Sequence, residues 1–238
     1  MTTVSRRRFL KSAAYGAAGG GVLGTAAATL ATSGTSFAIQ GIDVSHYQGS
    51  INWTSVKNSG KSFAFIKATE GTTYTDPTFA TNWAGAKAAG LIRGAYHFAH
   101  PGTDPVAQAN FFCNTVHPTT GDLQMMLDLE ATDGKTPSQV RSWTVSFINQ
   151  IVSRTGRPGI IYTGFYFWRD SAGNGSNLNC PLNLAAYVTD PNDYVPAAWS
   201  YFTFWQYTSS GTCPGVSGNV DRDAFNGSTS GLNALRLP

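Results

Sequence analysis

The residues in this chain best suited to acid–base chemistry are carboxylates that lie in or just after short apolar segments. In the stretch MMLDLEATDG, Asp128 and Glu130 follow an apolar run that is typical of a buried strand. Residues two positions apart on a strand share a face, so the two carboxyl groups can point the same way. Asp221 and Asp223 have the same spacing near the C-terminus, and Asp43 lies in another strand-like segment. Each pair could therefore present two carboxyl groups to one pocket.

Carboxyl groups that share a pocket can divide the roles of general acid and base. A cluster of carboxylates without a basic partner is costly to ionise fully, so at least one carboxyl pKa is expected to rise. One protonated and one ionised carboxyl group is the combination that glycoside hydrolysis requires. The residues alone also leave open a metal site, or solvated strand ends without catalysis. For Asp223, a turn or capping role is the simpler interpretation.

Aromatic side chains near the same predicted strand ends would suit a sugar substrate. The sequence contains 13% aromatic residues, which fits either stacking platforms for sugar rings or a large aromatic core. Glu70, directly after a predicted strand, is expected to help shape the cleft. The candidate substrate-binding residues are Tyr47, Glu70, Tyr96, Phe98, Tyr162 and Trp205.

The elements that must position these residues alternate between strands and helices along most of the chain. Five strand–helix units are predicted, with strands at 40–45, 62–68, 91–98, 123–130 and 158–164, followed by three strands at 182–188, 201–208 and 218–225. The pattern predicts an α/β protein with an irregular TIM-like barrel of five β/α units followed by three β-strands. An open doubly wound sheet is the alternative, but no glycine-rich dinucleotide motif follows the first strand. In a barrel, active-site residues lie at the C-terminal strand ends, and the first strand neighbours the last, which would bring Asp43 close to Asp221.

The N-terminal segment is predicted to be an export signal rather than part of the barrel. SRRRFLK precedes a weakly apolar stretch rich in Ala and Gly, and no acidic residue occurs before Asp43. The paired arginines Arg6 and Arg7 indicate the twin-arginine route. A membrane anchor is the alternative, but the many glycines disfavour a spanning helix. We expect residues 1–38 to be the signal, cleaved after SFA at 36–38 or after AAA at 26–28, and residues 39–238 to form one secreted, extracellular domain.

Charge and cysteine content narrow the possible partners. The predicted signal carries four of the 16 basic residues and none of the 13 acidic ones, so the remainder has 12 against 13, a formal charge of −1. This balance argues against nucleic-acid binding. No metal-ligand spacing surrounds the histidines or cysteines. Of the three cysteines, Cys113 lies in a helical pattern and is expected to be buried, whereas Cys180 and Cys213, both in loops, are predicted to form a disulfide.

Six motifs, in the right order, resemble glycoside hydrolase family 25, the Chalaropsis-type lysozymes or N-acetylmuramidases. The resemblance implies the five-plus-three barrel and hydrolysis of the β-1,4 bond between N-acetylmuramic acid and N-acetylglucosamine in bacterial peptidoglycan. It implies that Glu130 is the general acid, with Asp128, Asp43 and Asp221 as the other three acids of the site. Asp223 departs from the Asn that is common at that position. The motifs are GIDVSHYQGSINW (41–53), FAFIKATEG (63–71), RGAYHFAHP (93–101), LDLE (127–130), IIYTG (160–164) and FWQYTSSG…PGVSGNVDRDAFNGS (204–228).

Retention with an enzyme nucleophile and inversion are both open as mechanisms. We favour a third, in which the N-acetyl group of the substrate is the nucleophile and Asp128 orients it. No cofactor or metal is implied. The expected partner is the glycan strand of peptidoglycan, met by a monomer that keeps no stable membrane anchor after signal cleavage. The alternatives are a non-catalytic peptidoglycan-binding domain and a metal-dependent peptidoglycan amidase or deacetylase.

Overall fold

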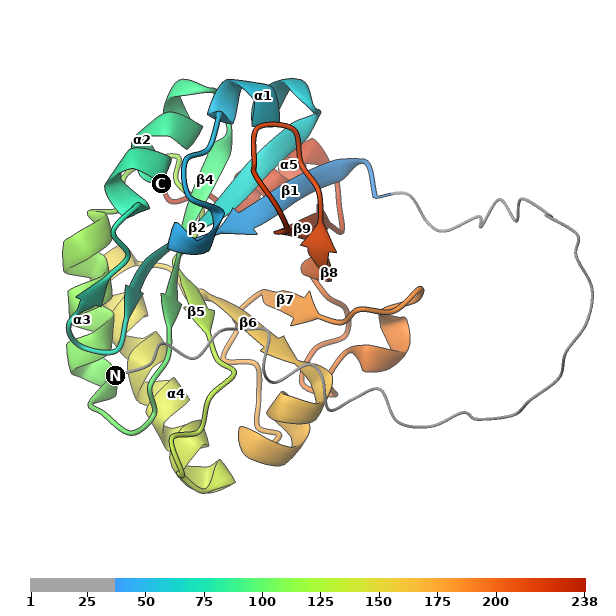
Figure 1. Ribbon diagram of the computed structural model, residues 1–238. Coiled ribbons are helices and arrows are strands. Elements are labelled where there is room, and N and C mark those ends of the chain that lie inside the picture. The colour runs from blue at the N-terminus through green and yellow to red at the C-terminus, as the bar shows by residue number, and fades with distance from the viewer. Residues whose placement is uncertain (1–36) are drawn as a thin grey trace, which may run out of the picture. The chain divides into compact units, whose positions relative to one another are not determined.

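Eight strands close into a barrel in the computed structural model, which describes residues 37–238 (Figure 1). The predicted export signal and its cleavage sites fall mostly on residues 1–36, outside the described residues. The strands of the barrel are β1 Ile39–Val44, β2 Lys61–Glu70, β4 Ile92–Phe98, β5 Met126–Asp128, β6 Ile160–Gly164, β7 Leu182–Ala185, β8 Phe204–Gly211 and β9 Val220–Phe225. An additional short strand, β3 Tyr74–Thr75, pairs antiparallel with β2 outside the ring.

The strand order confirms the predicted barrel. The order is β1-β9-β8-β7-β6-β5-β4-β2, and pairing of β1 with β2 closes the ring. Seven strands are parallel, and β9 runs antiparallel to both of its neighbours, β1 and β8. The C-terminal ends of the seven parallel strands therefore lie at one end of the barrel, called the mouth below. Because β9 runs the other way, it is its first residues that lie at the mouth.

Helices connect the first strands and cover part of the barrel, with α3 and α4 side by side (Figure 1). Asp104 caps α3 and is followed by proline, and Thr136 forms a capping box with Gln139 at the start of α4. Beyond β6 the connections hold only short helical turns, as predicted. The helices are α1 Trp53–Asn58, α2 Phe79–Ala88, α3 Pro105–Val116, α4 Pro137–Thr155 and α5 Thr229–Ala234, with helical turns at His46–Gln48, Phe167–Ser171 and Asn192–Tyr194. Within residues 37–238, no helix is both long and apolar enough to cross a bilayer.

The strands are buried on both faces, so the apolar core has two layers. One layer, which includes Ile66 and Leu127, packs between the strands and the helices. The other fills the barrel interior, where the rings of Phe63, Phe65 and Phe204 meet edge to face with centroids 5.2–5.7 Å apart. These rings occupy the lower interior, which leaves the mouth as the end where inward-facing polar side chains can be solvated.

The predicted disulfide between Cys180 and Cys213 is wrong. All three cysteines are buried free thiols. Cys180 precedes β7, and burial raises the pKa of its thiol to about 12. Cys213 lies in the β8–β9 connection, with its Sγ 3.7 Å from the hydroxyl of Ser59 at the end of α1. The Sγ of Cys180 instead contacts the carbonyl of Leu178, so the two thiols have different partners, which loop composition alone does not reveal. Cys113 is buried in α3, as predicted.

Candidate active site

The four predicted acids are brought to the mouth by three different strands. Asp43 lies near the end of β1 and pairs in register with Asp221 near the start of β9, which confirms that the first and last strands are neighbours. Asp128 ends β5, and Glu130 follows two residues later. Asp43 and Asp128 are buried, whereas Glu130 and Asp221 are partly exposed. The acids thus extend from the barrel interior towards solvent.

The pleat of β5 explains why Asp128 faces the interior. Met126 belongs to the interior layer of the core and Leu127 to the outer layer, so Asp128 faces inwards again. Its register partners are Phe98 on β4 and Tyr162 on β6, so these two residues lie on either side of the carboxylate. The short apolar run thus fixes the direction of the acid.

Gln206 was not predicted as a site residue, yet it organises the interior beneath the mouth. Its Nε2 donates a hydrogen bond of 2.6 Å to Oδ2 of Asp43. Its Oε1 accepts hydrogen bonds from the hydroxyls of Tyr162, at 3.0 Å, and Tyr187, at 2.7 Å. Because a carboxylate only accepts hydrogen bonds, the amide nitrogen faces Asp43, and the two hydroxyls donate to the amide oxygen. No sequence signal identified Gln206, because the inward direction of Phe204, two residues before it on β8, is known only from the packed barrel.

Asp223 does not have the turn or capping role that its sequence context suggested. It is fully buried, and its register partners are Gly41 on β1 and Gln206 on β8. It therefore adds a further carboxyl group to the barrel interior, below the level of Asp221.

Basic side chains that the sequence analysis did not single out also lie at the mouth, paired with Glu70 and Asp133. Lys67 follows Phe63 and Phe65 on the inward face of β2, and its Nζ lies 2.6 Å from Oε2 of Glu70. His100 bridges Glu70 and Asp133, with distances of 3.0 and 3.1 Å from its two ring nitrogens. The mouth therefore carries an alternating charge network on the rim formed after β2, β4 and β5.

The network shifts the pKa values of its members. Burial alone would raise the pKa of Glu70, but the hydrogen bond from His100 and the charge of Lys67 outweigh it and lower the pKa to about 2. The hydrogen bond to Glu70, together with Asp133, raises the pKa of His100 despite burial. Glu70 is therefore an ionised carboxylate that holds the rim together, and it is not a proton donor.

Tyr47 is the predicted substrate-binding residue whose ring is most accessible. Its side chain is 56% exposed on the helical turn after β1, and its ring lies 4.1 Å from that of His46. His46 is held in turn by Asp76, which accepts hydrogen bonds from its backbone N–H and its ring. Tyr187, which was not predicted, is 37% exposed and donates to Gln206. Both tyrosines offer open aromatic surface that an incoming sugar can reach.

The other predicted aromatic residues are buried. Tyr96, Phe98 and Tyr162 have almost no exposed surface, and Tyr96 and Tyr162 belong to the interior layer of the core. The prediction that Trp205 binds substrate is wrong. Trp205 is 9% exposed, packs in the outer layer against Phe37, and donates its indole N–H to the carbonyl of Ala186. It faces outwards because its neighbour on β8, Gln206, takes the inward position. Trp205 therefore does not offer a platform at the mouth.

Metal ligation finds no support in the arrangement of ligand side chains. Among residues 37–238, no group of three or more His, Cys, Asp or Glu side chains is arranged to hold a metal ion. What the mouth offers is proton transfer and charge stabilisation by carboxyl groups, next to exposed tyrosine rings. Carboxyl groups and accessible tyrosine rings at the C-terminal ends of barrel strands are an arrangement suited to the class of glycan-cleaving enzymes.

Comparison with known proteins agrees with this class. The family model described as glycosyl hydrolases family 25 matches residues 42–216. Lysozyme M1 of Streptomyces globisporus is 44% identical over 210 residues, 83% of this chain and 71% of its own length. The N,O-diacetylmuramidase of Chalaropsis sp is 37% identical over 204 residues, 77% of this chain and 96% of its own. The crystal structure of the bacterial lysozyme from Streptomyces coelicolor superposes with a TM-score of 0.80 at 43% identity, covering 85% of this chain and 98% of the other. The chain belongs to glycoside hydrolase family 25 and is a glycoside hydrolase.

Proposed function

We propose that the protein is a lysozyme that hydrolyses the β-1,4 bond between N-acetylmuramic acid and N-acetylglucosamine in peptidoglycan. The observation that carries the proposal is the gathering of Asp43, Asp128, Glu130 and Asp221 at the barrel mouth from three separate strands. The names of the relatives, lysozyme and N,O-diacetylmuramidase, support the same bond as the target. An amidase or deacetylase of the metal-dependent kind would need a ligand set, which residues 37–238 do not assemble.

Within this proposal, Glu130 is the general acid. It is partly exposed at the mouth, where it can reach the glycosidic oxygen of a bound glycan. Glu130 protonates the leaving oxygen while the carbonyl oxygen of the substrate's N-acetyl group attacks the anomeric carbon. Asp128 orients the acetamido N–H and stabilises the positive charge that develops. Water then opens the cyclic intermediate, with the Glu130 carboxylate accepting the proton.

The test uses purified peptidoglycan with the wild type, Glu130→Gln and a matched control, Asp193→Asn, which removes an exposed carboxylate outside the acid cluster. New reducing ends are counted, and the terminal sugar is identified by mass spectrometry after borohydride reduction. Reduced muramic acid from the wild type and the control, but not from Glu130→Gln, is the expected result. Reduced glucosamine would assign the cut to the other bond of the polymer. No reducing ends from the wild type would contradict the proposed activity.

The nucleophile is tested separately with Asp128→Asn. If the substrate's own N-acetyl group attacks, the variant turns over slowly but still binds glycan. Loss of binding together with turnover would contradict the assigned role of Asp128.

We also propose that the enzyme is exported by the twin-arginine route and acts as a monomer without a membrane anchor. The arginine pair Arg6 and Arg7 supports this route. Replacing both by lysine should retain the protein inside the producing cells, as measured by fractionation of cells and medium. The mass of the exported protein in solution, measured by light scattering, tests the monomer.

A further inference from the structure

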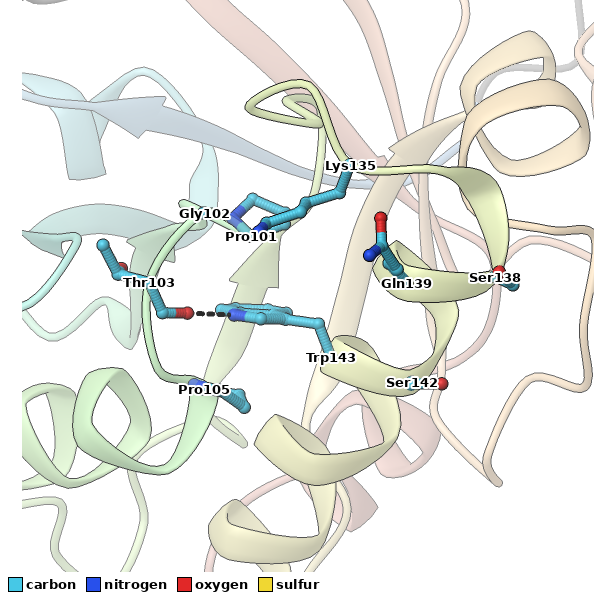
Figure 2. Close-up of a pocket in the computed structure, with 9 residues that line it drawn as sticks. All are labelled: Pro101, Gly102, Thr103, Pro105, Lys135, Ser138, Gln139, Ser142 and Trp143. Atoms are coloured by element: carbon cyan, nitrogen blue, oxygen red, sulfur yellow. Dashed lines mark hydrogen bonds between the residues drawn. The ribbon is translucent and has the colours of Figure 1, made fainter.

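A groove of about 400 Å³ lies between the connection that follows β4 and the first turns of α4 (Figure 2). Pro101, Gly102 and Thr103 form one wall, and Lys135 and Gln139 lie on the other side. Its size falls within the range of pockets that hold small ligands. None of the residues that line it belongs to the four acids or to the aromatic candidates at the mouth.

The groove is built from fixed parts. The indole N–H of Trp143 donates a hydrogen bond of 2.6 Å to the carbonyl of Thr103, which ties α4 to the opposite wall (Figure 2). Gly102 donates its backbone N–H to Oδ2 of Asp133 at 3.0 Å. Because Asp133 also contacts His100, the wall is joined to the charge network on the rim of the mouth.

The position of the groove relates it to the acids. One wall is the connection after β4, and the other is the end of the β5–α4 connection together with the first turns of α4. Lys135 lies only five residues after Glu130, in the same connection. Through Asp133 and His100 the groove wall is also linked to Glu70 on the rim, so a branch on a glycan bound at the mouth has a route to the groove.

The residues that line the groove suit a peptide with carboxylates better than they suit a sugar. The ring of Trp143 is stacked on Phe147 and almost fully buried, so it offers no open face to a sugar. Lys135 supplies a cation that, among residues 37–238, has no carboxylate within ion-pair distance. The Oε1 of Gln139 is held by the backbone N–H of Thr136 at 2.9 Å, which fixes the amide above the groove (Figure 2). A free cation beside a fixed amide suits a carboxylate and the peptide group next to it.

We propose that this groove binds the acidic stem peptide that branches from muramic acid, with Lys135 pairing with one of its carboxylates. The proposal rests on the proposed lysozyme function and adds a specificity: peptide-bearing strands are bound better than bare glycan. The ammonium of Lys135 is exposed, so its contribution is expected to be modest, about three- to fivefold in KM for its loss and more for charge reversal.

The test compares two substrates, peptidoglycan strands that carry stem peptides and the same strands after enzymatic removal of the peptides. Lys135→Glu is expected to raise KM at least fivefold on the peptide-bearing strands and to leave KM on the bare strands unchanged. Lys57→Glu, the same charge change on the exposed face of α1, should alter neither value. An equal rise on both substrates, or no rise on either, would overturn the proposal.

A binding measurement separates this proposal from the proposed function. Calorimetry with the tripeptide L-Ala-γ-D-Glu-L-Lys should detect binding to Glu130→Gln, and a several-fold weaker Kd when Lys135→Glu is added. A Kd that does not depend on Lys135 would overturn the groove assignment even if hydrolysis is normal. Wild-type protein that releases no reducing ends from either substrate would instead overturn the proposed function.

Discussion

Replacing Gln206 by Glu tests whether the interior network holds Asp43 as the structure indicates. Glutamate has nearly the same shape as glutamine and can still accept hydrogen bonds from Tyr162 and Tyr187. It cannot donate to Asp43 when ionised, and it places a second carboxylate where the amide nitrogen lies, 2.6 Å from Oδ2 of Asp43. The substitution therefore changes charge and donor capacity at one buried point.

The size of the effect follows from that distance. At an effective dielectric constant of 20, two unit charges about 2.6 Å apart repel by roughly 6 kcal/mol. The folded pair avoids this cost by keeping one proton, which the separated carboxyl groups of the unfolded chain release near pH 4. The folded state then binds more protons than the unfolded state. The variant is therefore expected to be close to wild type at low pH and to lose about 1.4 kcal/mol per pH unit over the range where only the folded pair holds the proton.

The assay is urea unfolding of wild type and Gln206→Glu at pH 5 and pH 8. We expect the free energy of unfolding of the variant to fall, relative to wild type, by at least 2 kcal/mol between the two pH values, estimated roughly from this slope. Tyr187→Phe is the matched control, since it removes one donor to Gln206 without adding charge, and its effect should be about 1 kcal/mol and independent of pH. A difference between Gln206→Glu and wild type that is the same at both pH values would refute the reasoning.

Three further predictions concern the stability of the barrel and its surface. Burial lowers the pKa of His97 to about 4, although a hydrogen bond to Gln108 raises it. An NMR titration of the His97 ring should therefore show a midpoint near pH 4. A midpoint near 6.5 would contradict its buried, neutral state. Because the unfolded chain then binds the proton more tightly, His97 should reduce stability by up to roughly 3 kcal/mol as the pH falls from 7 to below 4, a loss that urea unfolding across this range can measure. Asp122→Ala removes the carboxylate that lies 2.7 Å from Nε of Arg93 and leaves a buried guanidinium without it. The free energy of unfolding should fall by about 3–5 kcal/mol. A fall of under about 1 kcal/mol would mean that the pair is dispensable for stability. Tyr47→Ala should raise KM about five- to tenfold with little change in melting temperature, because the exposed ring contributes little to the core, and an unchanged KM would remove Tyr47 from the substrate site.

The order of elements and the positions of the acids follow from local sequence signals. Asp128 and Glu130 lie two residues apart after an apolar run, and this spacing by itself puts them on one face of a strand. Strand–helix alternation predicts a barrel, and a closed barrel makes the first and last strands neighbours. The closeness of the strands that carry Asp43 and Asp221 therefore follows from the order of the strands along the chain, whereas the register that pairs the two residues depends on the direction of β9. The antiparallel direction of β9 and the small strand β3 have no such local signal.

The tertiary structure decided which side chains face the mouth and which charges meet there. In FWQYT, apolar and aromatic residues occupy both faces of β8, because a barrel strand covered on the outside is buried on both faces. The sequence therefore does not show that Gln206 faces inwards and Trp205 outwards. The bridge that His100 forms between Glu70 and Asp133 depends on segments after β4 and β5 that meet the end of β2 only once the ring has closed. The local sequence pattern thus determines which elements form and how their side chains are spaced. The direction of each side chain and its partners depend on contacts between distant segments, which only the packed barrel brings together.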